Sequence, residues 1–262
     1  MLYRSISGPW PYLVALLLLE TPPLSKKLQK PPSQGLTAAA IQDSLLQRFS
    51  AIDDYTALVT ISVSMPRFRI PEKQLRLYYK RPGRVKIEAE GFAVVPRTGL
   101  APSPVEIIGD LFRLRVAGTM KNGDRTTWIL EGQIHPDSAR FGLFDRDIVE
   151  GGKLKMRLWI DGQGWFISRV ETLLDTVAVM VVESTFREYE KRIWLPEQTE
   201  LAFFISARTL EKMGDREPMG GPLGETHGEP GLEDFEGRVR LKYSGYRINI
   251  GLDDRIFRES DF

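Results

Sequence analysis

The chain has 262 residues, of which 42% are hydrophobic, enough to bury the core of one large β domain or two small ones. Its 36 basic and 35 acidic residues leave a formal net charge of +1. Without a strong field of one sign to attract phosphates, we expect no nucleic-acid partner. The absence of cysteine excludes disulfides, thiol nucleophiles and cysteine-ligated zinc.

Residues 1–35 are typical of an export signal followed by a linker. Arg4 precedes the apolar run Tyr12–Leu19, which is too short to span a bilayer but suits the hydrophobic part of a signal peptide. The alternative is a short buried helix that docks on the folded domain. Glu20 follows the run and no A-x-A motif comes close behind, so the cleavage site is undefined. Lys26–Gly35 is rich in Lys, Pro, Gln and Ser and predicts an unstructured linker.

A folded domain over 36–262 is predicted to open with an amphipathic helix. Thr37 is a suitable N-cap, and the helix should run to about Ala51. Apolar residues from Ile41 to Ile52 recur at spacings of three and four, so one side of the helix needs an apolar surface to lie on. A first strand is then predicted at Tyr55–Met65, because apolar and polar residues alternate strictly along it.

Lys73–Gly91 predicts a β-hairpin with its turn at Pro82-Gly83. We expect Arg81 to pair with Val85 across the loop Pro82–Arg84, which places Arg81 at the rim of the apolar face. The apolar residues that share this face are Leu77, Tyr79, Ile87 and Ala89.

Further strands follow at regular spacing with short turns. After a short helix at Pro104–Leu111, alternation predicts strands at Leu111–Val116, Thr126–Gly132, Leu154–Ile160, Trp165–Leu174 and Val177–Tyr189, with another opening at Trp194. His135–Asp147 is expected to be a loop.

Glu211–Gly231 interrupts the pattern with six glycines and three prolines. It cannot bury enough apolar surface to fold by itself, so we expect a flexible loop at 211–231. Because alternation resumes at Val239, this loop is expected to link neighbouring strands, and a domain boundary is the alternative. Tyr246–Phe257 is predicted as a last strand and a tail.

The fold class is therefore predicted to be mainly β (α+β), an antiparallel curved sheet whose concave face is partly covered by helices. Such a sheet can leave an apolar cavity able to take an acyl chain, as small β-barrels do. The alternative that the pattern leaves open is an ordinary filled core.

No pattern of residues indicates catalysis. Nucleophile elbows, phosphate-binding loops and zincin helices are absent from the sequence, and the two histidines, His135 and His227, fall in expected loops. Adjacent carboxylates such as Asp53-Asp54 would point to opposite faces of a strand, which suits them poorly for cooperating as acid and base. We expect no catalytic residue, no metal site, no cofactor and no enzymatic activity.

Several motifs resemble those of the LolA/LolB-like superfamily of periplasmic lipoprotein carriers and outer-membrane lipoprotein-sorting proteins. LRLYYKRPGRVKIEAEG is similar to that family's strand–(K)RPG–strand signature, and WIDGQGWFISRVET to its following strand pair. A strand closing on WLP and the segment YSGYRINIGLDDRIF then follow in the same order as the corresponding motifs of that family. The resemblance covers about Leu36 to Phe257. Two features depart from it: the stretch GFAVVPRTGLAPSPVEIIGDL replaces the family's usual hairpin, and the glycine-rich loop is an addition.

The resemblance implies an unclosed antiparallel β-barrel with helices plugging its concave side and acyl chains of a lipoprotein or lipid bound between them. It implies an exported monomer in the periplasm, loaded by an inner-membrane donor protein and unloaded by an outer-membrane acceptor protein. It also implies that Arg81 bonds backbone carbonyls of the plugging helices and holds a lid closed. The expected ligand-binding residues are Arg81, Leu75, Leu77, Tyr79, Val85, Ile87, Trp128, Leu130, Met156 and Leu158.

Three functions follow as hypotheses from the sequence and the resemblance. The first is a carrier that moves acyl chains of lipoproteins or lipids between membranes without catalysis. The second is a regulatory sensor of envelope stress built on the same half-barrel. The third is a lipid hydrolase, for which the sequence offers no catalytic group.

Overall fold

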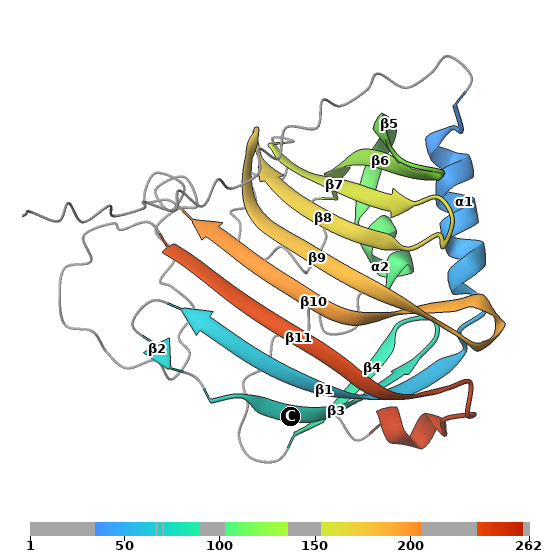
Figure 1. The fold of residues 1–262 in the computed structure, drawn as a ribbon, viewed down its shortest axis with the longest axis vertical. Coiled ribbons are helices and arrows are strands. Elements are labelled where there is room, and N and C mark those ends of the chain that lie inside the picture. Colours follow the sequence, from blue (N-terminus) through green and yellow to red (C-terminus); the bar gives the residue numbers. More distant parts are fainter. Residues whose placement is uncertain are drawn as a thin grey trace, which may run out of the picture.

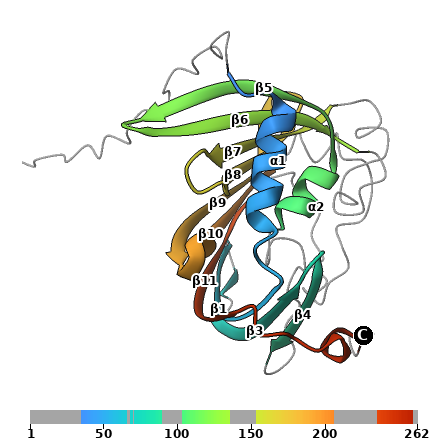
Figure 2. The ribbon, with the colours of Figure 1, turned by 90° about the vertical axis from the view of Figure 1, so that its right-hand side faces the viewer.

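The computed structural model describes residues 35–65, 68–69, 71–89, 103–135, 153–205 and 235–258. They form one antiparallel sheet that curves around two helices, as Figure 2 shows. The strands run in the order β4-β3-β1-β11-β10-β9-β8-β7-β6-β5, and the short β2 pairs with β1 (Figure 1). The edge strands β4 and β5 are not paired with each other, so the sheet is unclosed. The predicted fold class is confirmed.

The bounds of the strands agree with the alternation in the sequence over most of the chain. They are β1 (Asp54–Met65), β2 (Phe68–Arg69), β3 (Lys73–Lys80), β4 (Arg84–Ala89), β5 (Leu111–Asn122), β6 (Arg125–Ile134), β7 (Leu154–Asp161), β8 (Ile167–Leu174), β9 (Val177–Tyr189), β10 (Ile193–Ile205) and β11 (Phe235–Ile248). One-turn 3-10 helices lie at Glu190–Arg192 and Asp254–Phe257. The strand predicted at Leu111–Val116 is longer than expected and extends to the turn with β6.

Two helices lie on the concave face of the sheet (Figure 2). Helix α1 (Ala38–Phe49) begins as predicted, with the Thr37 hydroxyl accepting a hydrogen bond from the amide of Ala40. Its apolar stripe buries Ile41 and Leu45 completely. Helix α2 (Pro104–Gly109) confirms the short helix predicted there and contacts α1. None of the described helices is long and apolar enough to cross a membrane.

The hairpin β3–β4 has the predicted faces but another register. Leu77 pairs with Ile87 and Tyr79 with Val85, so the loop is Arg81–Gly83 and the predicted pairing of Arg81 with Val85 is wrong. The reason is that the Arg81 amide donates to the carbonyl of Asp53, 2.8 Å away, and so continues the ladder with β1 instead of β4. Arg81 nevertheless lies at the rim.

The prediction of a separate last strand from Tyr246 is wrong as well, because β11 runs unbroken from Phe235 to Ile248. A bulge at Gly245, whose φ is +61°, shifts the register with β1 and breaks the alternation that the sequence shows. The chain beyond Ile248 leaves the sheet as a tail.

Buried side chains form two core clusters. The first core cluster joins Ile41 and Leu45 of α1 to apolar residues of α2 and of β5 to β9. The second core cluster joins Ile52 to apolar residues of β1, β3, β10 and β11. Helix α1 thus packs on the first cluster along its length and points its C-terminal end toward the second.

Some predictions fall outside the described residues. The first is the export signal and linker at 1–35, of which the structure describes only Gly35. The others are the loop at 211–231, which contains His227, and the loop predicted at His135–Asp147, of which only His135 is described. The strands that flank 206–234, β10 and β11, are neighbours in the sheet, as expected for the two sides of that segment.

Candidate functional site

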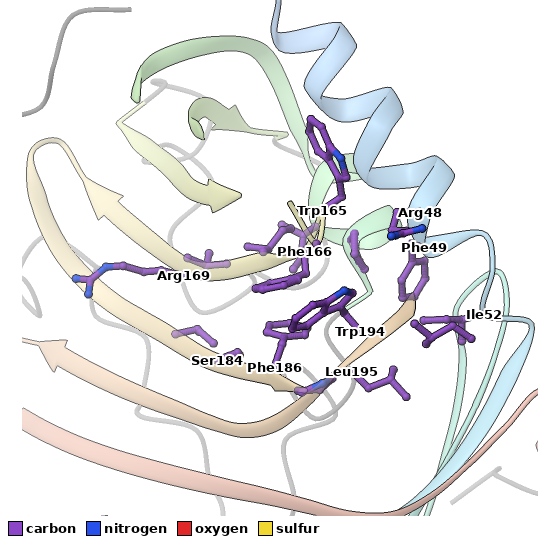
Figure 3. A pocket seen from close by; sticks show the side chains of 18 of the residues that line it. Arg48, Phe49, Ile52, Trp165, Phe166, Arg169, Ser184, Phe186, Trp194 and Leu195 are labelled. Carbon is purple, nitrogen blue, oxygen red and sulfur yellow. The ribbon is translucent and has the colours of Figure 1, made fainter. Parts of the chain in front are cut away.

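A pocket lies where the C-terminal end of α1 faces the ends of β8, β9 and β10 (Figure 3). It is a small cavity of about 60 Å³. The described residues that line it are Arg48, Phe49, Ile52, Tyr55, Pro104, Ile107, Gly164, Trp165, Phe166, Ile167, Arg169, Val170, Val182, Ser184, Phe186, Ile193, Trp194, Leu195 and Pro196. Members of both core clusters are among them, so the pocket lies between the clusters.

Three aromatic rings from three strand ends form one wall of the pocket. Phe166 stacks on Phe186 with ring centroids 4.2 Å apart, and it meets Trp194 at 5.2 Å (Figure 3). All three side chains are only half-buried, so the wall keeps accessible aromatic surface. Such flat apolar surfaces bind acyl chains and rings through dispersion and water release.

Gly164 makes this stacking possible. A Cβ at Gly164 would lie 2.4 Å from the Phe166 ring and 3.3 Å from Trp194, so any larger residue would push the rings apart. The turn that presents Gly164 is held by the carboxylate of Asp161, which accepts hydrogen bonds from the amides of Gln163 and Gly164 at 2.9 and 2.6 Å. Asp161-Gly162-Gln163-Gly164 therefore serves as a rigid turn that positions the aromatic wall.

The polar groups of the pocket are few. Ser184 shares a hydrogen bond of 2.8 Å with the Thr199 hydroxyl. Burial raises the pKa of Tyr55 well above its ordinary value, so this phenol stays neutral at physiological pH. Arg169 lines the pocket, but its side chain points away from the rings and bonds Glu171 and Glu183 (Figure 3). Arg48 is the remaining charged residue of the lining.

Arg81 ties the β3–β4 turn to the end of α1. Its guanidinium donates to the carbonyl of Ser50, the C-cap residue of α1, at 2.9 Å, and to the Asp53 carboxylate at 2.6 Å. The contact with a helix carbonyl is of the kind that the resemblance implied. The second helix also reaches this turn, because the Glu106 carboxylate lies so close to Gly83 that a Cβ there would be 2.6 Å from it. One turn therefore touches both covering helices.

The C-terminal tail is fastened to the same corner. Asp54 is buried, and its carboxylate accepts hydrogen bonds from the amides of Ile250 and Leu252 at 2.8 and 2.9 Å. Asn249 accepts from the amide of Asp53 and donates to the carbonyl of Ala51. The loop between α1 and β1 is thus held from both sides.

Two cations of the hairpin hold the end of this tail. Lys80 bonds the carbonyl of Leu252 and the Asp254 carboxylate, and Arg84 bonds that carboxylate at 3.1 Å. These contacts lower the pKa of Asp254 to about 2. In the sequence, the residues of the tail that make these contacts lie in the run Asn249–Asp254 of the terminal motif. The motif alone did not indicate that they fasten the tail to the hairpin.

The predicted ligand-binding residues lie in the two core clusters and, Arg81 apart, form the floor of the concave face. Leu75, Leu77 and Tyr79 are buried in the second cluster, and Val85 and Ile87 pack against it. Leu130, Met156 and Leu158 are buried in the first cluster, and Trp128 packs against it. None of these residues appears in the pocket lining, so their contact with a ligand stays a prediction.

The pocket's own aromatic residues were missed, because Trp165, Phe166, Phe186 and Trp194 stand at strand ends, where alternation no longer assigns a face. A concentration of aromatic residues flanking the Gly164 turn was the available signal.

The described part of the chain contains no group of three or more His, Cys, Asp or Glu residues that could hold a metal ion. His135 is exposed just beyond β6, with its ring 5.9 Å from that of Phe112. The geometry is that of a binding pocket with an aromatic wall.

The architecture defines a class, the unclosed antiparallel half-barrel with helices on its concave face. No protein-family model and no curated protein matches the chain. Among solved structures, it is similar to a DUF1329 family protein from Desulfovibrio piger, with a TM-score of 0.53 and 11% identity over 85% of this chain and 98% of that one. This likeness shows that the two chains share a fold.

Two further solved structures are similar to the chain at a lower TM-score. A LolA superfamily protein from Nitrosomonas europaea has a TM-score of 0.47 and 13% identity over 85% of this chain and 98% of its own. A putative outer membrane lipoprotein-sorting protein domain from Vibrio parahaemolyticus has a TM-score of 0.47 and 11% identity over 82% and 95%. The unclosed half-barrel that the motifs implied is thus present in the sheet itself, and its fold is shared with the Desulfovibrio protein.

Proposed function

We propose that this protein is a carrier that binds acyl chains of lipids or lipoproteins beneath helix α1 and performs no chemistry on them. The observation that carries the proposal is the aromatic pocket at the C-terminal end of α1, where Arg81 fastens that end to the hairpin turn. The names of similar solved structures, a LolA superfamily protein and a lipoprotein-sorting domain, support the same kind of ligand.

The size of the cavity indicates that binding requires movement. An engineered cavity of roughly 150 Å³ accommodates one benzene molecule, whereas this pocket has about 60 Å³. An acyl chain therefore fits only if α1 moves away from the strand ends. The first turn to move would be the last turn of α1, which carries Phe49 into the pocket and ends at Ser50.

Arg81 is proposed to set the balance between the closed and open states. Its hydrogen bond to the carbonyl of Ser50 exists only while the end of α1 rests on the hairpin. A ligand that binds only the open form has its affinity reduced in proportion to the open fraction. We call this contact of Arg81 with the end of α1 the latch, and weakening it should therefore raise the affinity for the ligand.

We further propose that the carrier works in the periplasm as a monomer, loaded by an inner-membrane donor and unloaded to an outer-membrane acceptor. This part of the proposal rests on the export-type N-terminal segment 1–35 and on the lipoprotein-sorting name of a similar structure. The proposed domain that does this work is 36–262, with the acyl chain also contacting the floor residues Leu77, Tyr79, Leu130 and Leu158.

The test is the affinity of the purified chain for a fluorescent acyl probe, measured in wild type and in Arg81→Leu. The exposed hydrogen bond from the guanidinium to Ser50 contributes about 1 kcal/mol, so the open fraction and the affinity should rise about fivefold when it is lost. Equal affinities would rule out Arg81 as a latch, and failure of the wild-type protein to bind any acyl probe would refute the carrier function.

The matched control is Arg76→Leu, which removes one cation from the exposed outer side of the same hairpin and should leave affinity unchanged. Arg84, on the other side of the turn, is a poorer control. It bonds Asp254 and lies over the Phe257 ring at 5.6 Å, so its loss would disturb the tail.

A further inference from the structure

Arg48 is a charged group of the pocket that forms no ion pair with any residue that the structure describes. It lies in the last turn of α1, is half-buried and lines the pocket beside Phe49. The described lining contains no Asp or Glu. Arg169, the other charged lining residue, is neutralised by Glu171 and Glu183 on the outer face of the sheet.

The Nε–H of Arg48 is buried and makes no hydrogen bond within the described part of the chain. A buried donor without an acceptor destabilises a fold, and natural structures contain few of them. Position in the last turn of a helix gives Arg48 some stabilisation from the helix dipole, but that interaction supplies no acceptor for Nε. This donor is therefore available to an acceptor supplied by a ligand.

We propose that Arg48 binds the anionic head of an amphiphile, a carboxylate or a phosphate, whose acyl chain lies along the aromatic wall. A guanidinium presents five N–H donors and pairs with either anion in a bidentate manner. Trp194, Phe166 and Phe186 stand across the pocket from Arg48 and provide the apolar surface for the adjoining chain (Figure 3). This inference rests on the proposed carrier function and narrows its ligand from acyl chains in general to those with a charged head.

The site is coupled to the latch through one helical turn. Arg48 precedes by two residues the C-cap Ser50, whose carbonyl accepts the hydrogen bond from Arg81. Arg48 already lines the pocket, so an anion bound to it is held by the same turn that has to leave Arg81 before an acyl chain can enter.

The experiment compares three probes that share an oleoyl-type chain: oleate, an oleoyl lysophosphatidate and the neutral monoolein. Their affinities for the full chain are measured by displacement of a fluorescent acyl probe, in wild type and in Arg48→Gln, Arg48→Lys and Arg247→Gln. Arg247 is exposed on the outer face of β11, so its variant removes the same charge from the opposite side of the sheet.

In Arg48→Gln we expect anionic probes to bind about tenfold more weakly, because a charge-assisted hydrogen bond is lost, and monoolein to change less than twofold. Arg48→Lys should recover part of the loss, and Arg247→Gln should behave as wild type. The anion with the larger loss identifies the head, a fatty-acid carboxylate or a phospholipid phosphate.

Three results would overturn the role of Arg48 alone, and a fourth would overturn the carrier function with it. If Arg48→Gln lowered the affinity for monoolein as much as that for the anionic probes, Arg48 would be a structural residue. If Arg247→Gln lowered the affinity for the anionic probes as much as Arg48→Gln does, the effect would be one of surface charge in general. Unchanged binding of the anions in Arg48→Gln, with monoolein still bound, would remove the anion site but leave the carrier function. If wild type bound none of the probes, the carrier function and the anion site would both be refuted.

Discussion

Asp54 shows how one residue can hold together segments that are far apart in the sequence. It lies at the start of β1, directly after the loop that follows α1, and its carboxylate bonds two amides of the C-terminal tail. Its carbonyl also accepts a hydrogen bond from the amide of Asn249 at 2.8 Å. A buried carboxylate is tolerated here because backbone donors satisfy it.

Replacing Asp54 by Asn should therefore destabilise the protein. The new amide group would face a backbone N–H with its own donors, leaving a buried donor unsatisfied at a cost of about 1–3 kcal/mol. Urea-induced unfolding measures the change. The neighbouring Asp53→Asn is the control, because the Asp53 side chain is 65% exposed and its pair with Arg81 should contribute less than about 1 kcal/mol. If both variants lost the same free energy, the burial of Asp54 would be of no consequence.

At the same scale, the sequence predicted the core better than the site. Alternation identified Leu77, Tyr79, Leu130 and Leu158 as inward-facing, and all four are essentially inaccessible to solvent. Arg81 was placed at the rim through its position before the turn. Arg48 was not singled out, because an arginine in the last turn of an amphipathic helix is ordinary in sequence and becomes notable only through its unpaired Nε.

At the scale of elements, strands β5 to β9 are joined on their outer face by a ladder of alternating charges. Glu131 of β6 is bonded by Arg115 of β5 at 2.5 Å and by Arg157 of β7 at 2.9 Å. Arg169 bonds Glu171 within β8 and Glu183 on β9, and both Arg157 and Arg169 lie over the Trp159 ring. Arg157 also pairs with Glu171 of β8 at 3.6 Å, so ion pairs between neighbouring strands run from β5 to β9 and support the half of the sheet that carries the aromatic wall.

Glu131 should make the stability of this half depend on pH. Burial raises the pKa of Glu131, but hydrogen bonds from Arg157 and Arg115 outweigh it, so the net pKa is lowered. A lowered pKa in the folded state gives stability that is present above the unfolded pKa, about 4.3, and is lost as the pH falls through the folded pKa. Glu131→Gln should thus cost about 1–2 kcal/mol at pH 7 and progressively less below pH 4.

Unfolding free energies of wild type and variant across pH 3 to 8 test this expectation. Glu183→Gln serves as the control at the exposed end of the ladder, where the side chain is 59% accessible, and should cost less than about 1 kcal/mol. A difference between wild type and Glu131→Gln that stayed constant down to pH 3 would contradict the assignment of the lowered pKa.

The elements themselves could largely be read from periodicity, whereas pairing could not. The faces of β3 and β4 were predicted correctly, but their register was decided by the amide of Arg81, which bonds β1. The bulge at Gly245 made one strand look like two. Both errors arise where the conformation of a residue is decided by its backbone pairing with a strand that is distant in sequence.

At the scale of the whole molecule, the strand order combines a meander of consecutive strands with one pairing between strands that are far apart in the sequence, β1 and β11. Strands β5 to β11 pair in sequence order, which short turns make predictable. The pairing of β11 with β1 brings the end of the chain beside its first strand, and no local pattern specifies it. The pocket depends on the pairing of β1 with β11, because residues of β1 and β10 line it and these strands lie on opposite sides of β11.

Residues 206–234 connect two strands that are already paired at their ends, with Ile205 opposite Phe235. A two-residue Asn-Gly turn can join such ends. Closing a flexible loop costs about 0.6 kcal/mol more for each doubling of its length. Shortening the connection to two residues removes roughly four doublings, so it should stabilise the protein by up to about 2 kcal/mol.

The replacement of 206–234 by Asn-Gly should therefore leave the fold intact and raise the urea midpoint. A variant in which 206–234 is replaced by a Gly-Ser segment of the same length is the control, and it should match wild type. If both variants lost stability, the natural residues of this segment would contribute contacts that their composition does not suggest. If both kept stability but lost affinity for the acyl probe, the segment would belong to the binding site and not merely to the connection between β10 and β11.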